Sequence, residues 1–157
     1  SLIRINADEV TYSLHIILRF ELELALVRKE LSVSDLPAAW NEGMEQLLGI
    51  RPDNDANGVL QDVHWSMGAI GYFPTYALGN LFGAQFFHSL IGEIPDIESR
   101  IAQGDLLAIR EWQRRNIHRY GASLTAGELC RKVNGEDLDA RYFTEYLERK
   151  FEKLDVL

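Results

Sequence analysis

The residues with the most chemical capacity lie in the segment Gly58–Trp65, which reads Gly-Val-Leu-Gln-Asp-Val-His-Trp. Polar groups placed between a loop and a core need hydrogen-bond partners. One interpretation is structural: Asp62 caps the following turn, Gln61 bonds the backbone and His64 is a satisfied core histidine. The other is functional: Asp62 or a neighbour orients His64 toward a cleft, where the imidazole donates a hydrogen bond to developing negative charge.

Two phenols follow within the segment 71–80, at Tyr72 and Tyr76. If Pro74 begins a helix, the two tyrosines lie about one turn apart. Phenol hydroxyls in this arrangement can donate to an oxyanion without carrying a charge of their own. The alternative is that both rings pack in the core with satisfied hydroxyls, which is common for tyrosine.

The four histidines, His15, His64, His88 and His118, show no paired-ligand spacing. A helical zinc site of the His-Glu-x-x-His type requires two histidines one turn apart. We therefore expect no metal ligands in this chain. His15 and His118 are interpreted as residues on helix faces, and His88 as a helix residue.

The elements that position these residues are predicted to be helices. Asn6 and Glu9 resemble a capping box before a long helix over 10–31, whose apolar residues recur at helical spacing while Glu23 and its neighbours mark wetter positions. A second helix begins after Ser34 and Asp35 and ends at Gly49, and an exposed loop covers 50–58.

The segment 59–92 is rich in glycine and aromatic residues and almost free of charge, which predicts that the segment is largely buried and forms a turn followed by a helix. After Pro95, short helices are expected from Asp96, over about 105–120, after the capping box of Thr125 and Glu128, and over 139–154. No strand pattern of comparable length occurs. The predicted fold is all-α, and the 157 residues predict a single domain.

Composition excludes several classes of function. The chain has 46% hydrophobic and 25% charged residues, which is typical of a globular protein, and a formal net charge of −8. That charge disfavours nucleic-acid and anionic-membrane binding, because phosphate contacts require a clustered basic surface. Arg114, Arg115 and Arg119 come nearest to such a cluster and are interpreted as a solvated helix face.

The single Cys130 cannot form an internal disulfide and favours a reducing compartment, so a cytoplasmic location is expected. No apolar run approaches the roughly 20 residues of a membrane-spanning helix, and no basic-then-apolar signal segment starts the chain. Residues 1–4 lead directly into a patterned helix without an initiator methionine. We therefore expect the chain to begin inside a longer protein.

The segment Gly58–Trp65 matches at every position the Gly-x-x-Gln-Asp-x-His-Trp signature of the Taq-type metallocarboxypeptidases, peptidase family M32. Residues 3–8, Ile-Arg-Ile-Asn-Ala-Asp, fit the Ile-Arg-x-x-Ala-Asp motif of the same family. Residues 71–79 also continue in the family's manner. The chain thus resembles the C-terminal part of a larger, mainly helical metallopeptidase of this family.

This resemblance implies that the parent protein removes single residues from the C-terminus of peptides. Its divalent metal, of the zinc or cobalt type, would be held by a His-Glu-x-x-His helix and a further Glu in an N-terminal part that is absent from residues 1–157. This chain would be the opposite wall of the cleft, catalytically inert alone. Family members are often homodimers, so a homo-oligomer is expected.

The resemblance also assigns roles to individual residues. Arg4 would grip the substrate's terminal carboxylate, because a guanidinium can donate two charge-assisted hydrogen bonds to it, and Asp8 would help to hold Arg4. His64 would donate to the oxyanion of the tetrahedral intermediate, with Tyr72 and Tyr76 as further donors. Gln61 and Asp62 would fix the geometry of the site.

A competing class is a non-enzymatic helical module that binds a partner through its apolar, glycine- and aromatic-rich surface. A large exposed apolar patch favours self-association. This alternative also predicts an oligomer.

Overall fold

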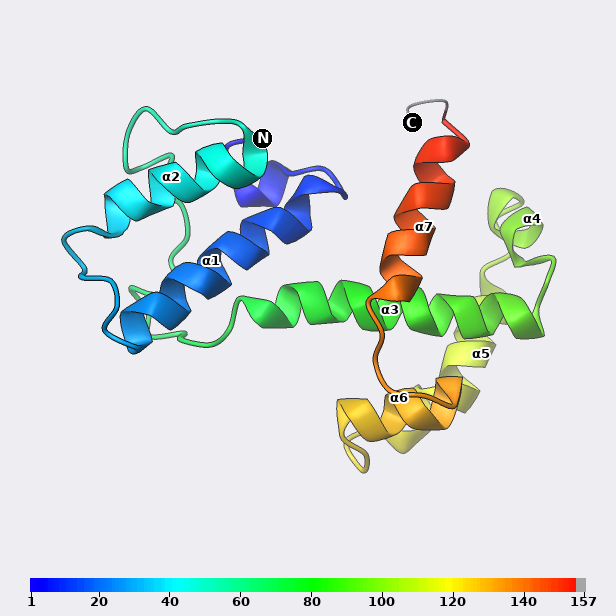
Figure 1. Cartoon of the computed structure of the whole chain (residues 1–157). Helices are drawn as coiled ribbons and strands as arrows, with labels where there is room; N and C mark the ends of the chain where they lie inside the picture. Colours follow the sequence, from blue (N-terminus) through cyan, green and yellow to red (C-terminus); the bar gives the residue numbers. More distant parts are fainter. Residues whose placement is uncertain (155–157) are drawn as a thin grey trace. The chain divides into compact units, whose positions relative to one another are not determined.

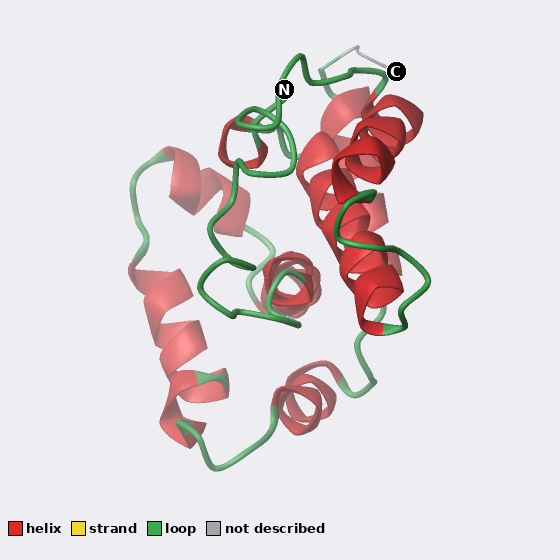
Figure 2. Cartoon of the chain, turned by 90° about the vertical axis from the view of Figure 1, so that its left-hand side faces the viewer, coloured by secondary structure: helices red, strands yellow, loops and turns green. Residues whose placement is uncertain are grey.

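A computed structural model describes residues 1–154 of the chain. Over these residues the chain consists of helices joined by loops and turns, and no strand is present (Figure 2). The all-α prediction is therefore confirmed.

The described residues form two compact units, residues 1–78 and the residues from 79 onward. The boundary falls inside one helix, α3 (Pro74–Glu93), which starts in the first unit and continues into the second. Because the two units share this helix, the single-domain count stays a prediction.

The first unit opens with the short 3₁₀ helix η1 (Arg4–Asn6) and the helix α1 (Thr11–Val27). The start of α1 differs from the predicted capping box of Asn6 and Glu9. Asp8 caps it instead: its carboxylate accepts hydrogen bonds from the backbone N–H groups of Val10 and Thr11 and from the Thr11 hydroxyl. An exposed carboxylate here satisfies backbone donors that lack partners within the helix.

Helix α2 (Leu36–Leu48) packs along α1 (Figure 1). The core between them contains mainly aliphatic residues and one tryptophan: Leu18, Leu22, Leu36, Trp40, Met44 and Val59. The helices approach closely at Gly43, where an added Cβ would lie 2.2 Å from Leu18 Cδ1. As predicted, Gly49 ends α2 in the left-handed conformation, with φ of 66°.

An irregular segment, residues 49–73, connects α2 to α3. Gly68 and Gly71 have φ values of 79° and 78°, a region that residues with a Cβ rarely adopt. These two glycines are required for their backbone conformation. The predicted order of turn and then helix is confirmed, with Pro74 as the first residue of α3.

The second unit contains the rest of α3 followed by α4 (Ile97–Ala102), α5 (Leu107–Asn116), the 3₁₀ helix η2 (His118–Tyr120), α6 (Ala126–Asn134) and α7 (Arg141–Glu152). Its core contains Leu90, Ile97 and Trp112. The predicted capping box at α6 is present, with Thr125 and Glu128 bonding each other's backbone N–H groups. The buried amide of Gln85 binds Asp137 and Asp139, fixing the loop before α7 on α3.

Two predictions of burial were wrong. The segment 59–92 was predicted to be largely buried, yet several of its apolar side chains are exposed: Leu60, Val63, Met67, Ile70, Tyr72 and Leu78. Glu23 was assigned to a wetter position of the first helix, yet it is only 6% exposed. Its burial is possible because both carboxylate oxygens accept hydrogen bonds, one from the Trp65 indole and one from the backbone N–H of Gly71.

Candidate functional site

Arg4 lies at the centre of the polar cluster of the first unit, 6% exposed. Its guanidinium meets the Asp62 carboxylate side-on, with Nη2 at 2.7 Å from Oδ1 and Nε at 3.2 Å from Oδ2. Its Nη1 donates to the Tyr12 hydroxyl at 3.1 Å, and the guanidinium lies 4.9 Å from the centre of the Tyr76 ring. These contacts hold the guanidinium in one orientation.

Asp62 receives a second guanidinium from α1, because Arg19 Nε donates to its Oδ2 at 2.7 Å. Burial alone would raise the pKa of Asp62, but the hydrogen bonds and charges of Arg4 and Arg19 outweigh it and lower that pKa. Burial likewise tends to lower the pKa of Arg4, but Asp62 outweighs it and raises that pKa. Asp62 is thus an ionised carboxylate between two cations, not the cap of a turn.

Gln61 joins the two sequence motifs. Its Oε1 accepts from the Arg4 backbone N–H at 2.9 Å and from Arg19 Nη2 at 2.8 Å. Its Nε2 donates to the carbonyls of Leu2 and Asn57. The structural prediction that Gln61 bonds the backbone is confirmed, and the amide uses both of its ends to connect residues 2–4 with residues 57–61.

One face of α1 carries the polar residues that hold this arrangement. His15, Arg19 and Glu23 follow each other at four-residue spacing, so they share a side of the helix. Glu23 accepts from the Trp65 indole at 2.8 Å and from the backbone N–H of Gly71. This face therefore fixes both ends of the segment that contains His64.

His15 contributes as a neutral side chain. Burial and then the Arg19 charge lower the pKa of His15 to about 4, so the imidazole is uncharged at neutral pH. Its Nε2 lies 3.0 Å from the Ser1 carbonyl, which requires the proton on Nε2. His15 thereby fastens the first residue to α1, and its carbonyl accepts from Arg19 Nη1 at 2.7 Å.

His64 and Tyr76 form a hydrogen-bonded pair, with Nε2 and the phenol oxygen 3.0 Å apart. The other ring nitrogen, Nδ1, is buried without a hydrogen-bond partner among the described residues and lies 3.7 Å from Asp62 Oδ1. The imidazole also packs 4.4 Å from the Phe73 ring and 5.7 Å from the Tyr72 ring, measured between centroids. Tyr72 itself is 48% exposed.

The site residues predicted from the sequence are thus brought together, with one difference. Arg4, Gln61 and Asp62 form one hydrogen-bonded network, and His64 packs against Tyr72 and Tyr76 beside it. Asp8 was expected to hold Arg4, but its carboxylate binds the start of α1, and Asp62 is the carboxylate that binds Arg4.

Sequence reasoning missed the roles of four residues of α1: Tyr12, His15, Arg19 and Glu23. A signal for the last three was present, because they recur every fourth position among apolar residues. Polar side chains on the apolar stripe of a helix are expected to have buried partners. The sequence could not show which distant segment supplies those partners.

The residues of this structure do not fit a metal centre. Among residues 1–154, no group of three or more His, Cys, Asp or Glu side chains lies close enough to hold a metal ion.

Cys130 is buried and has a free thiol. Across the described chain, no helix has both the length and the apolar character needed to cross a membrane.

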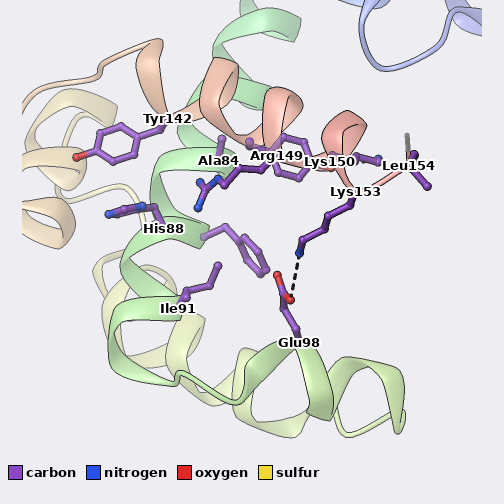
Figure 3. A pocket seen from close by; sticks show the side chains of 11 residues that line it. Ala84, His88, Ile91, Glu98, Tyr142, Arg149, Lys150, Lys153 and Leu154 are labelled. Carbon is purple, nitrogen blue, oxygen red and sulfur yellow. Dashed lines mark hydrogen bonds and ion pairs between the residues drawn. The ribbon is translucent and has the colours of Figure 1, made fainter. Parts of the chain in front are cut away.

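A separate hollow of about 420 Å³ lies in the second unit, between α3, α4 and α7 (Figure 3). Its wall is aromatic and aliphatic in the interior, and Arg149 and Lys153 lie at its rim, the latter paired with Glu98 at 3.7 Å. No residue predicted for the site lines this hollow, and its charged side chains are exposed.

Comparison with known proteins agrees with the two motifs. Residues 1–151 match the family described as Carboxypeptidase Taq (M32) metallopeptidase. The chain is 50% identical over 154 residues to thermostable carboxypeptidase 1 of Thermus thermophilus, and 41% identical over 157 residues to carboxypeptidase 1 of Bacillus subtilis. These two matches include 98% and 100% of this chain, but only 30% and 31% of the lengths of the two relatives.

The fold is similar to that of solved carboxypeptidases. The crystal structure of the M32 carboxypeptidase from Deinococcus radiodurans superimposes with a TM-score of 0.95 at 42% identity, over 98% of this chain and 31% of that one. A structure of the Pyrococcus furiosus carboxypeptidase gives a TM-score of 0.93 at 47% identity, over 96% of this chain and 30% of that one.

Proposed function

Because the chain belongs to the Taq (M32) family of metallocarboxypeptidases, we propose that it forms the substrate-carboxylate and oxyanion side of a peptidase cleft. The reaction is hydrolysis of the C-terminal residue of a peptide. The chain spans about 30% of the length of the curated relatives that it matches, so the activity belongs to a longer protein. The observation that carries the proposal is the clustering of Arg4, Asp62 and the His64–Tyr76 pair in one unit.

The metal of the family is proposed to be a divalent ion of the zinc or cobalt type, bound by residues outside this chain. Residues 1–154 offer no ligand group for it. The chain's own share of catalysis is therefore binding, orientation and stabilisation of charge. Alone, it is expected to be inactive.

Arg4 is the proposed partner of the substrate's terminal carboxylate. Its Nε and Nη2 donate to Asp62 and its Nη1 to Tyr12, which engages three of the five N–H groups of a guanidinium. Two N–H groups have no acceptor among the described residues. Two cations, Arg4 and Arg19, share the carboxylate of Asp62, so Asp62 does not neutralise Arg4 alone.

Gln61 and Asp62 are proposed to support this site by holding the guanidinium of Arg4 and the backbone of the motif. Asp8 supports it indirectly, because it fixes the start of α1 from which Tyr12 and Arg19 project. Burying a carboxylate between two fixed guanidiniums prevents it from repelling an incoming anion.

His64, Tyr76 and Tyr72 are proposed to stabilise the oxyanion of the tetrahedral intermediate. If His64 Nε2 carries the proton, it donates to the Tyr76 oxygen, and the phenol hydrogen is then directed to the oxyanion. If the proton is on Nδ1, beside Asp62, Tyr76 donates to the imidazole instead. Only the first arrangement leaves the pair a donor for the substrate, and that donor is the Tyr76 hydroxyl.

The experiment uses a full-length M32 carboxypeptidase whose matching segment is replaced by residues 1–157. An N-acylated dipeptide with a free C-terminal carboxylate and its C-terminal amide are compared as competitive inhibitors. Arg4→Ala should raise the inhibition constant of the acid by about 100-fold or more, because a charge-assisted bidentate contact is lost. The inhibition constant of the amide should change little.

Arg51→Ala is the matched control, because Arg51 lies in the same unit and pairs with Glu45 but is 55% exposed at its side chain. It should leave both inhibition constants unchanged. Equal weakening of acid and amide by Arg4→Ala would contradict the assignment of Arg4.

Self-association is proposed for the isolated chain, in line with a helical interaction module as the second candidate function. The exposed apolar side chains of residues 60–72, including Leu60 at 70% and Met67 at 71%, form part of one unit. Exposed apolar surface favours an oligomer, and light scattering of the purified chain should show one. A monomer at high concentration would contradict this proposal.

The single, buried Cys130 supports a cytoplasmic location for the protein.

A further inference from the structure

The charges around Asp62 are unequal. One carboxylate, with a side chain 11% exposed, faces the guanidiniums of Arg4 and Arg19 at 2.7 Å each. Glu23 is the other buried carboxylate nearby on α1, but its oxygens accept from Trp65 and Gly71. Asp62 therefore faces two cations at once, whereas the donors to Glu23 are neutral, in a place where water is largely excluded.

The two arginines differ in what they can reach. Arg19 is fully buried, 4.6 Å from the Trp40 ring and 5.5 Å from the Phe73 ring, and its donors go to Asp62, Gln61 and the His15 carbonyl. Burial lowers its pKa to about 10, which still leaves it a cation at neutral pH. No ligand can contact it.

Arg4 binds both oxygens of Asp62 and, unlike Arg19, keeps some exposure. Its side chain is 7% exposed and belongs to the short helix η1, and two of its N–H groups have no acceptor among residues 1–154. An anion entering the site can meet Arg4 but not Arg19. The affinity of Arg4 for that anion depends on how far Asp62 has already neutralised it.

We infer that Arg19 determines the specificity for a free terminal carboxylate without touching the substrate: it compensates Asp62 from the buried side, so that Arg4 keeps its charge for the ligand. Asp62 then serves to orient Arg4 rather than to cancel it. Arg19 is a positioning residue in this sense. The inference rests on the proposed function of Arg4 as the carboxylate-binding residue.

A purely structural role for Arg19 would have a different consequence. Its loss would then loosen the whole network and weaken acid and amide ligands alike. Loss of charge compensation instead weakens only the acid, because Asp62 is left to neutralise Arg4 and to repel the incoming carboxylate. The ratio of the two inhibition constants separates these roles.

The test measures this ratio in the full-length carboxypeptidase that carries residues 1–157, with the same dipeptide acid and amide. Arg19→Gln should lower the preference for the acid about tenfold, while Arg19→Lys, which retains the charge, should stay within about twofold of the unsubstituted protein. Inhibition by the amide should change by less than about twofold in both variants.

A double variant is the control for misfolding, because Arg19→Gln alone changes the balance of buried charge. In Arg19→Gln/Asp62→Asn, both the buried cation and the negative charge that it compensates are removed, so Arg4 is again not neutralised, while the substituted amide oxygen can still accept from Arg4 and orient it. The acid preference should return to within about threefold of its original value. Further loss in the double variant would overturn the inference.

Parallel measurement of Arg4→Ala distinguishes the inference from its premise. If Arg4→Ala abolishes the acid preference but Arg19→Gln leaves it intact, the role of Arg19 is refuted and the function of Arg4 stands. If Arg4→Ala leaves the preference intact, the proposed function of Arg4 fails, and the role of Arg19 fails with it.

Discussion

At the scale of single residues, the Asp62 carboxylate is where three segments of the chain meet. Arg4 arrives from η1, Arg19 from α1, and Gln61 precedes it in the loop. Removing one member of a buried charge network typically costs about 3–5 kcal/mol, because the remaining charges lose their compensation. The members of this network are therefore expected to be far less replaceable than exposed ion pairs such as Arg51–Glu45.

The hydrogen bond between His64 and Tyr76 makes a kinetic prediction for the full-length carboxypeptidase that carries this segment. His64→Ala and Tyr76→Phe should each lower kcat by about 10²–10³, the usual cost of losing one oxyanion donor. Because the two side chains act as a unit, the double variant should be little worse than the more impaired single variant. Steady-state kinetics of the four proteins measures this coupling.

Tyr72→Phe is the comparison for this pair. Tyr72 stacks on the His64 ring and is half exposed, and its substitution removes only the hydroxyl. A loss of kcat in this variant would assign Tyr72 an independent donor role. Multiplicative losses in the His64/Tyr76 double variant would contradict the coupled pair, and unchanged kinetics in both single variants would remove the oxyanion assignment.

The sequence alone could indicate the chemical content of residues 58–65, because an amide, a carboxylate and an imidazole stand close together there. It could not rank the two arginines. Arg19 occurs among apolar residues of a helix, and its partners Gln61 and Asp62 are more than 40 positions away. Contacts at such separations depend on tertiary packing and not on local pattern.

At the scale of elements, α1 acts as the platform of the site. His15, Arg19 and Glu23 fasten residue 1, residues 61–62 and residues 65–71 respectively to one side of this helix. Helix α1 is itself held in place because it packs on α2 through Leu18 and Trp40. A displacement of α1 against α2 would therefore move the polar face and the site together.

The crossing of α1 and α2 makes a stability prediction. A Cβ at Gly43 would lie 2.2 Å from Leu18 Cδ1, and Leu18 is 2% exposed and has little room to move. Gly43→Ala should therefore lower the free energy of unfolding by about 1–3 kcal/mol through overpacking. Urea unfolding of the chain measures this change.

Gly83→Ala is the matched control on α3. No atom lies within 4 Å of an added Cβ there, and alanine is the better helix former, so the substitution should stabilise by about 0.5–1 kcal/mol. Destabilisation of similar size by both substitutions would refute the steric explanation for Gly43.

Local signals predicted the elements best where the capping chemistry is self-contained. Gly49 and the pair Thr125–Glu128 need only their own helix, and both were predicted correctly. The start of the first helix was predicted wrongly, because Asn6 and Asp8 are both good capping residues. The chain selects Asp8, since residues 4–6 are occupied by η1.

At the scale of the whole molecule, the apolar character of residues 59–92 was interpreted as burial, yet the chain leaves much of it exposed. An apolar composition indicates that a segment tends to be buried, but it does not indicate which part of the protein buries it. The chain corresponds to only about 30% of its relatives, and we propose that the remainder of such a protein packs on this surface. The oligomer proposed for the isolated chain follows from the same surface.

The most direct test of the central claim is peptide hydrolysis by carboxypeptidase 1 of Bacillus subtilis in which residues 1–157 replace the matching 31% of its length. The account predicts that this protein releases C-terminal residues, and that Arg4→Ala or Tyr76→Phe within the inserted segment lowers kcat/KM by about 10² or more. A folded, active protein whose kcat/KM is unaffected by both substitutions would contradict the claim that this chain supplies the substrate and oxyanion side of the cleft.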